Sequence, residues 1–546
     1  MTEGGRAKRK AVGGLGRRTL VLIHWKILTL VLGVVFAFVA LGITQVPAAA
    51  ADERGAYSPD FAAIDHYIEE EMEATRLPGL ALAIVRDDRI VHLRGFGASS
   101  SSGRKVTPQT PFVIGSTGKS FTALAIMQMV EEGKIDLDAP VKRYITWFEV
   151  ADEEVSSRIT LRHLLIHTSG LPTAADRGYV VREDPSYGAL ENEVRALEDV
   201  ELSRPVGSSF EYSNMNYTIL GLTVQTISGE PYERYVEERI FAPLDMNHSF
   251  ANHEEAKENG LTQGYRYWFG IPRPTDLIYN RAALPAGLHA ASAEDMAHHL
   301  IAQLNGGSYG GEAVLSPEGI AEMHRGAVRG TVMDGTEFSY GMGWSETEIN
   351  GIPAISHSGG TPISSSDMIL VPKDRWGVMV LTNAANYSSP RIGEIGDGVV
   401  SLLKGREVPP PSGPGQMLIG SFALVGILVL QILGIVRSVV LTRRWRSRPE
   451  AAPRGVTQMA LRVWALLTVN LLWAFASLIV APSLLAPGVP FSGLLLMDFG
   501  QMLVASGAVA LIWGILRLVL VSRTLRQTGA ARLVSRKETE VSPVNA

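Results

Sequence analysis

Apolar residues follow two different spacings in the region between residues 58 and 404. Residues 58–75 carry them at helical spacing, and much of 110–330 shows the same pattern with long loops. Short runs typical of strands lie near both ends of the region, at 79–85, 89–96, 352–356, 368–371 and 377–381. Strands that flank a helical insertion predict an α+β domain whose two chain ends contribute to one sheet.

Three uncharged stretches near the C-terminus predict a membrane segment. They contain 20, 23 and 18 residues, at 417–436, 463–485 and 499–516, and a helix needs about 20 apolar residues to cross a bilayer. Six arginines lie within 442–462, and the tail after residue 516 is also basic. Because basic loops stay in the cytoplasm, we expect three transmembrane helices within 417–521, with the 442–462 loop and the tail 522–546 cytoplasmic.

The N-terminus has the pattern of an export signal. A basic run is followed by the uncharged stretch Ile27–Ile43 and by small residues at 47–51. Both a cleaved signal peptide and an uncleaved anchor within residues 1–50 fit this pattern, and either places the domain 51–404 outside the cytoplasm. Residues 405–416 are rich in Pro and Gly and are expected to form an extended linker.

Charge and cysteine content exclude several kinds of site. The chain has 546 residues, too many for a single ordinary core. Its net charge is only −5, but residues 51–416 contain 30 basic and 50 acidic side chains, a net charge of −20. A domain this acidic repels the phosphate backbone of a nucleic acid, so no nucleic-acid partner is expected. The chain has no cysteine, which excludes disulfides, thiol nucleophiles and Cys-ligated metal sites.

The segment Gly115-Ser116-Thr-Gly-Lys119 precedes a helical run at 120–132, so Ser116 and Lys119 are expected on one face of the first turn. A serine hydroxyl needs a neighbouring base, and a lysine can supply one when burial depresses its pKa. The pattern is weak alone, because Ser102/Lys105 and Ser401/Lys404 have the same spacing.

Two further motifs follow in order. Tyr212-Ser213-Asn214 is the only Tyr-x-Asn in the chain, and His357-Ser358-Gly359 closes a strand-like run and is followed by Gly360. Glycines at the end of a strand leave the backbone open to a substrate carbonyl. Taken singly, each motif also fits a core aromatic residue, a turn or a plain loop.

The three motifs together resemble those of the class C β-lactamase and serine DD-peptidase superfamily. Further similarity lies at Leu77-Pro-Gly79, at Gly133-Lys-Ile-Asp-Leu and at His167-Thr-Ser-Gly-Leu-Pro172, and the resemblance covers nearly all of 58–404. It implies an antiparallel sheet backed by helices, a helical lobe beside it, and a site in the groove between them. No Ser-Asp-Asn motif is present, which disfavours a class A enzyme.

The resemblance also implies roles for the motif residues. Ser116 would be the acylated nucleophile, and Lys119 and Tyr212 would share the proton transfers, with the first acceptor left open between them. Asn214 would orient Lys119 and the substrate amide.

The strand residues would form the substrate-binding side. His357 and Ser358 would border the substrate beside Gly359, and the backbone N–H groups of Ser116 and Gly360 would form the oxyanion hole. Potent β-lactamases have a lysine where this chain has His357. A neutral imidazole holds a substrate carboxylate less firmly than a lysine does.

These features predict a membrane-anchored extracytoplasmic serine hydrolase that acts through an acyl-enzyme on cell-wall-type peptides or β-lactams. An esterase or D-aminopeptidase would use the same residues, and a non-catalytic membrane sensor or binding module is the alternative from another class. The expected partners are a small-molecule or peptide substrate and membrane lipid; protein partners are not indicated. No cofactor or metal is expected, since His298 and His299 are adjacent on a helical run and point apart.

Overall fold

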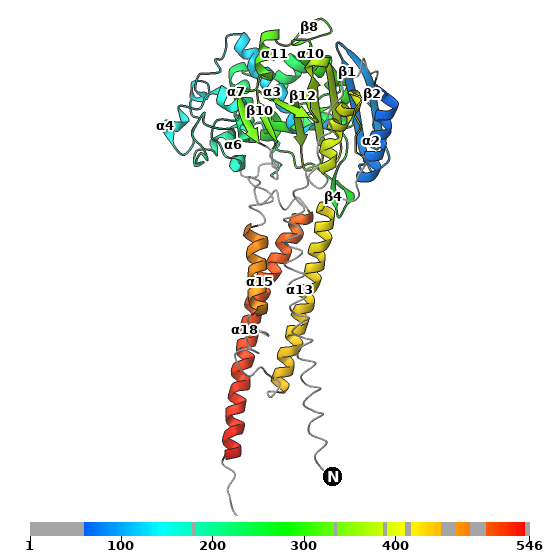
Figure 1. Cartoon of the computed structure of the whole chain (residues 1–546). Coiled ribbons are helices and arrows are strands. Elements are labelled where there is room, and N and C mark those ends of the chain that lie inside the picture. Colours follow the sequence, from blue (N-terminus) through cyan, green and yellow to red (C-terminus); the bar gives the residue numbers. More distant parts are fainter. Residues whose placement is uncertain are drawn as a thin grey trace, which may run out of the picture. The chain divides into compact units, whose positions relative to one another are not determined.

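The computed structural model describes residues 59–176, 182–331, 336–385, 390–409, 416–448, 452, 465–480 and 498–540. The predicted signal segment 1–50 lies outside these residues. Residues 59–409 form an α+β domain, and three helices follow it in the sequence (Figure 1).

An eight-stranded antiparallel sheet is the centre of the domain. Its spatial order is β2-β1-β14-β13-β12-β11-β10-β9. The strands are β1 (Gly79–Arg86), β2 (Arg89–Gly97), β9 (Val328–Thr331), β10 (Glu337–Tyr340), β11 (Ser345–Ile349), β12 (Ile352–Gly360), β13 (Ser365–Val371) and β14 (Trp376–Thr382). Because β1 pairs with β14, the prediction that both chain ends share one sheet is confirmed.

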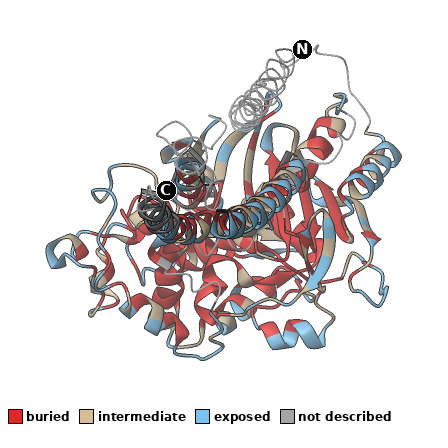
Figure 2. Cartoon of the chain, turned by 90° about the horizontal axis from the view of Figure 1, so that it is seen from below, coloured by how far each residue is buried: buried red, intermediate tan, exposed pale blue. Residues whose placement is uncertain are grey.

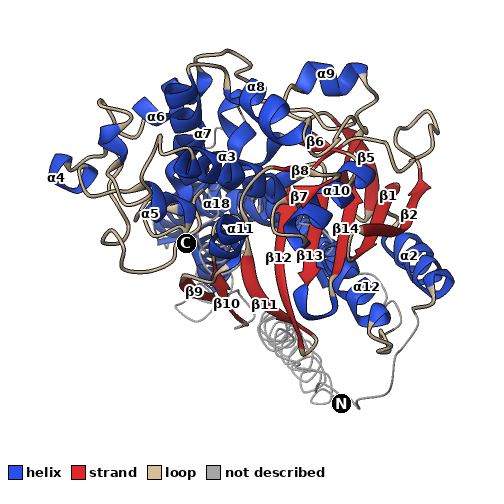
Figure 3. Cartoon of the chain, turned by 90° about the horizontal axis from the view of Figure 1, so that it is seen from above, coloured by secondary structure: helices blue, strands red, loops and turns tan. Residues whose placement is uncertain are grey.

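Both faces of the central strands are covered, as Figure 3 shows. Helices α2 (Phe61–Thr75) and α12 (Ile395–Leu403) cover one face, where Ile68, Val378 and Val399 belong to one apolar cluster. Helix α10 (Ala293–Leu304) covers the other face. Its N-cap is Ser292, whose hydroxyl accepts from the Asp295 N–H at 3.1 Å. Every residue of β13 and β14 is buried, as strands enclosed on both faces must be.

The helical lobe shares its core with that second face of the sheet. Its elements are α3 (Lys119–Glu131), α4 (Glu153–Ser156), α5 (Leu161–Leu165), α6 (Ala189–Arg195), α7 (Asn214–Ser228), α8 (Tyr232–Val236), α9 (His253–Glu258) and α11 (Pro317–His324). The first nine residues of α3, from Lys119 to Met127, are all buried. Figure 2 shows buried residues filling the interior and exposed residues along the outer helices.

Three two-stranded sheets complete the domain: β3 (Phe112–Val113) with β6 (Ala290–Ala291), β4 (Gly264–Trp268) with β5 (Ile271–Thr275), and β7 (Ser308–Tyr309) with β8 (Glu312–Ala313). The first pair has a direct consequence for Ser116. It ties the segment just before Ser116 to the segment just after residue 288, so two parts of the chain that are distant in sequence lie side by side.

The C-terminal part contains α13 (Gln416–Ser447), α15 (Ala465–Phe475) and α18 (Asp498–Glu540). The three helices meet at Ser506, which accepts from Gln431 Nε2 at its carbonyl and from Trp473 Nε1 at its hydroxyl, both at 3.1 Å.

Two of these helices, over Ile419–Ser447 and Gly500–Thr524, are long and apolar enough to cross a membrane, where the sequence predicted three. The second predicted span, 463–485, contains only the shorter apolar stretch Leu467–Ile479 within the described residues. Helix α18 also continues to Glu540, so the described part of the predicted tail is helical.

Candidate active site

Ser116 lies in a tight turn between β3 and α3. This turn, η1 (Gly115–Gly118), is a 3-10 helix that leads directly into α3. The Thr117 hydroxyl fixes the turn by donating to the Ile114 carbonyl at 2.8 Å. Lys119 follows as the first residue of α3, and its spacing of three places it beside Ser116.

Glycines allow η1 to lie directly against the end of β12. Gly115 has φ +58°, and a Cβ on it would lie 2.5 Å from the Gly360 nitrogen. A Cβ on Gly359 would collide with the Ile114 carbonyl oxygen and lie 3.1 Å from the Ser116 nitrogen. The backbone N–H groups of Ser116 and Gly360 are therefore close neighbours, as an oxyanion hole requires.

The side chain of Lys119 is fully buried beside Ser116. Its Nζ lies 3.1 Å from Ser116 Oγ, 2.9 Å from Asn214 Oδ1 and 2.6 Å from the Ala286 carbonyl oxygen. Burial holds the pKa of Lys119 well below its usual value, because an ammonium loses its hydration inside the protein.

The hydrogen-bond partners of Lys119 determine what its neutral form can do. A neutral amine has two N–H groups and one lone pair, and the Ala286 carbonyl and Asn214 Oδ1 can only accept. Both N–H groups are used by these acceptors. The lone pair is then left for the Ser116 hydroxyl, which is the arrangement of a general base.

Tyr212 approaches Ser116 from the helical lobe. Its hydroxyl donates to Ser116 Oγ at 2.8 Å, and Lys119 Nζ lies 4.9 Å from the centre of its ring. An aromatic ring at that distance stabilises the protonated form of Lys119. Burial has the larger effect on this amine, so the pKa of Lys119 remains low. Ser116 Oγ thus has an amine and a phenol within hydrogen-bond distance.

His167 supports the segment that carries Tyr212. Its ring packs against that of Tyr212 at a tilt of 31°, with 4.4 Å between the ring centres. Its Nδ1 accepts from the Ser213 backbone at 3.2 Å and from Asn216 Nδ2 at 2.9 Å. His167 is fully buried with φ +57°. The stretch that contains His167 supported the resemblance, but no sequence motif assigned His167 itself to the site.

His357 on β12 faces the same site. Its Nε2 lies 3.0 Å from the Tyr340 hydroxyl, and its Nδ1 lies 2.8 Å from the Ser358 carbonyl oxygen. Burial, reinforced by the charge of Lys119, lowers the pKa of His357 to about 4. The imidazole is therefore neutral at pH 7. Tyr340 and Ala286 were not predicted from the sequence, since neither belongs to a recognisable motif.

The side chain of Ser358 lies on the opposite face of β12 from that of His357. It pairs with Asp367 of β13, and its hydroxyl bonds to the Asp367 carboxyl. His357 pairs instead with Met368, which belongs to the core shared with the helical lobe. Neighbouring residues on a strand point to opposite faces, so the side chains of His357 and Ser358 lie on different faces of β12. A place for Ser358 beside the substrate stays a prediction.

The end of β12 also has a free edge. Pairing with β11 stops at Ser356, whereas pairing with β13 continues to Gly360. The backbone of 357–360 can therefore bond an extended substrate as an added strand.

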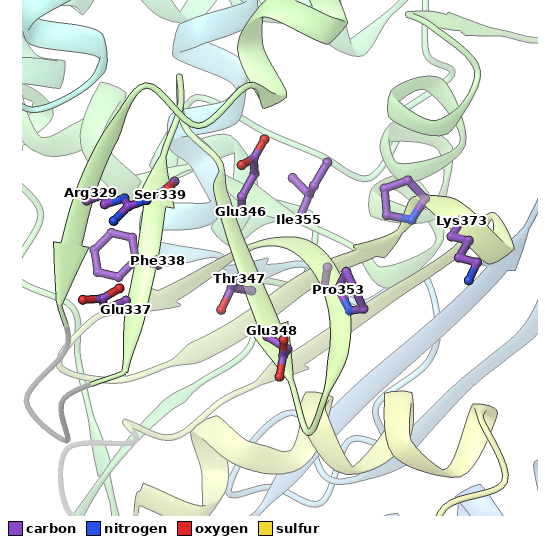
Figure 4. Close-up of a pocket in the computed structure, with 12 residues that line it drawn as sticks. Arg329, Glu337, Phe338, Ser339, Glu346, Thr347, Glu348, Pro353, Ile355 and Lys373 are labelled. Atoms are coloured by element: carbon purple, nitrogen blue, oxygen red, sulfur yellow. The ribbon is translucent and has the colours of Figure 1, made fainter. Parts of the chain in front are cut away.

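Two other features in the described residues lie apart from Ser116. A cavity of about 580 Å³ lies on β9 to β12 and is lined in part by Glu346, Glu348 and Lys373 (Figure 4). His248, Glu294 and Asp295 have potential metal-ligand atoms within 4.8 Å of one another. Asp295 Oδ2 already accepts from the His248 N–H and the Ser249 hydroxyl at 2.7 Å each, so this group serves the start of α10.

The adjacent histidines of α10 point apart, as expected from the sequence. His298 Nδ1 lies 3.1 Å from the Leu244 carbonyl oxygen, and His299 Nε2 lies 3.1 Å from Ser120 Oγ.

Several curated proteins are similar to this chain in sequence over most of the domain. The Staphylococcus aureus (strain N315) protein flp is 27% identical over 332 residues, which cover 61% of this chain and 64% of the relative. The chain thus spans less than two thirds of that relative. Penicillin-binding protein 4 of Amycolatopsis lactamdurans is 30% identical over 337 residues, covering 60% of this chain and 87% of the relative.

Solved structures share the fold. The octameric penicillin-binding protein homologue from Pyrococcus abyssi has a TM-score of 0.57 and 28% identity, covering 67% of this chain and 81% of that one. EstCE1, a hydrolase with promiscuous acyltransferase activity, has a TM-score of 0.53 and 22% identity, covering 62% of this chain and 98% of that one. The Beta-lactamase family matches residues 64–395, and the chain belongs to this family of serine hydrolases.

Proposed function

We propose that this chain is a membrane-anchored serine hydrolase that acts through an acyl-enzyme on Ser116, with its active site on the extracytoplasmic face. The observation that carries the proposal is the buried Lys119 amine, which lies 3.1 Å from Ser116 Oγ while Tyr212 donates to the same oxygen at 2.8 Å. A solvated lysine beside a capping serine would not need burial or three polar partners.

The proposed reaction has two steps, acylation of Ser116 and hydrolysis of the acyl-enzyme, and each step needs a proton transfer. Neutral Lys119 takes the Ser116 proton as Oγ attacks the substrate carbonyl, and the backbone N–H groups of Ser116 and Gly360 bind the developing oxyanion. Lys119 and Tyr212 then return the proton to the leaving group, and the acyl-enzyme remains. Water, deprotonated by the same pair, releases the acid and restores the serine.

The proposed substrates are cell-wall-type peptides or β-lactams. One of the relatives is a penicillin-binding protein, which supports this class. Esters or D-amino-acid peptides are the second candidate, because neutral His357 and a domain of net charge −20 disfavour anionic ligands. A non-catalytic sensor would not require the buried lysine, so the intact site argues against it.

Membrane anchorage is proposed from the two apolar helices and the basic segments. Three spans leave the C-terminus in the cytoplasm, whereas two spans would place it outside. The arginines at 443–462 favour a cytoplasmic position for the loop after α13 in both arrangements.

Ser116→Ala is expected to abolish covalent labelling by a serine-reactive fluorophosphonate and by a labelled penicillin. Intact-mass analysis of the wild type should show one adduct. Ser102→Ala is the matched control, because Ser102 has the same spacing to a lysine but lies exposed in a loop, and it should label normally. An adduct that persists in Ser116→Ala would contradict the assignment.

Lys119→Ala and Tyr212→Phe are each expected to slow acylation by at least ~100-fold, the usual contribution of a positioned acid or base. Because burial lowers the pKa of Lys119, the base is present above that lowered pKa, and the wild-type rate should fall only when the pH drops through it. Stopped-flow acylation across pH tests both statements. Lys105→Ala is the control for loss of a lysine, and near wild-type rates in either site variant would refute its role.

His357→Lys is expected to speed acylation by penicillin at pH 7 by about 10-fold, equivalent to 1.4 kcal/mol, because it adds a cation for the substrate carboxylate. His357→Gln, which stays neutral, should give no such gain, and a neutral p-nitrophenyl ester should not benefit from either change. Rates on both substrates with one preparation decide the matter. Wild-type penicillin hydrolysis near about 10⁸ M⁻¹ s⁻¹ would make an efficient β-lactamase the correct assignment.

The membrane topology can be measured with single cysteines, since the chain has none. With three spans, a membrane-impermeant thiol reagent on intact cells should label Pro490→Cys but neither Glu450→Cys nor Glu540→Cys. With only two spans, Glu540→Cys should be labelled and Pro490→Cys protected. Labelling of Glu450→Cys would overturn both arrangements.

A further inference from the structure

The hairpin of β4 and β5 has one face in the protein core and one face outside it. Tyr265 and Tyr267 are buried in the apolar cluster beneath α2 and α12. The Tyr265 N–H donates to the Asn383 carbonyl at 2.9 Å, and Arg76 Nη1 donates to the Gly270 carbonyl at 3.4 Å. The hairpin is therefore held at its base and at its tip.

The outer face of the hairpin carries two cross-strand pairs, one of basic and one of apolar residues. Arg266 lies directly opposite Arg273, and Trp268 lies directly opposite Ile271. Trp268 and Ile271 remain 40% and 43% exposed, although each could gain from burial. This face thus presents two cations and two large apolar side chains together.

Exposed Trp268 and Ile271 beside two arginines match a lipid bilayer, which has an apolar interior and can have anionic headgroups. Trp rings favour the headgroup layer of a bilayer, and each basic side chain near an anionic membrane contributes about 1 kcal/mol. The hairpin 264–275 contains two arginines and no acidic residue, within a domain of net charge −20. A repelled acidic domain would need such a local basic contact to rest on anionic lipid.

The chain keeps this hairpin within reach of a bilayer. Only residues 404–415 separate the end of α12 from the start of α13, and twelve residues span at most about 40 Å when fully extended. Pro272 and Pro274 lie on β5 and lack the N–H groups that a strand of a second copy would need. Both facts favour a lipid surface over a second copy as the occupant.

We propose that the outer face of the β4–β5 hairpin docks on a phospholipid bilayer that contains anionic headgroups. The hairpin would set the orientation of the domain above the membrane and so the direction in which Ser116 faces. This inference rests on the proposed membrane anchorage, but it concerns a different part of the chain.

The test uses the full chain in nanodiscs of phosphatidylcholine with and without phosphatidylglycerol, and in detergent. A fluorophore on Phe269→Cys should be quenched by spin-labelled lipid when phosphatidylglycerol is present. The same fluorophore on Glu312→Cys, at the other exposed hairpin, should not be quenched. Adding Arg273→Gln to Phe269→Cys should lower the equilibrium constant for contact about 5-fold, the equivalent of 1 kcal/mol per basic residue.

Hydrogen exchange of the unlabelled wild type provides a second measurement. Backbone amides of 268–271 should exchange more slowly in anionic nanodiscs than in detergent, and those of the β7–β8 hairpin should not change. Equal quenching at both cysteines, or equal exchange in both media, would overturn the proposal. Protection that grows with protein concentration in detergent would assign the face to a second copy instead. A chain that fails to float with vesicles refutes the anchorage itself, whereas one that floats without these signals refutes only the hairpin contact.

Discussion

The buried amine of Lys119 is the group on which the arrangement of both lobes depends. Its three polar partners come from η1, from the start of α7 and from the Ala286 carbonyl. An amine removed from water without partners costs several kcal/mol, so each segment must be in place before the site can form. Burial also favours the neutral amine, because the same loss of hydration depresses the pKa of Lys119.

The approach of η1 to β12 is a second constraint, and it acts through backbone rather than side chains. Gly115 and Gly359 have no room for a Cβ, and Gly287 would place one 2.8 Å from the Gly115 carbonyl carbon. Three separate segments therefore meet at one point only because glycine stands at each. This contact brings the N–H groups of Ser116 and Gly360 together, and it explains why the motif glycines matter as much as the reactive side chains.

The sequence predicted the sheet shared by both chain ends and the meeting of Ser116, Lys119, Tyr212 and Asn214, because short motifs carry those residues. It could not predict Ala286, which contributes only a backbone carbonyl, or Tyr340, which reaches His357 from two strands away. The alternation of side chains along a strand places Ser358 and His357 on opposite faces of β12, so the role of Ser358 beside the substrate stays a prediction. Hydropathy predicted three spans, and two helices within the described residues are long and apolar enough to cross a membrane; of the predicted span 463–485 the structure describes only 465–480.

Strand β12 lies between two titratable groups that are both neutral at pH 7. On one side burial keeps His357 unprotonated, with a pKa of about 4. On the other, burial and the charge of Asp397 raise the pKa of Asp367 to about 8, so the carboxyl bonded to Ser358 is mostly protonated. Neither face of the strand therefore offers a full charge to a ligand. Under the proposed function, recognition along 357–360 would depend on backbone hydrogen bonds and on shape, which suits an extended peptide or a neutral ester better than a small anion.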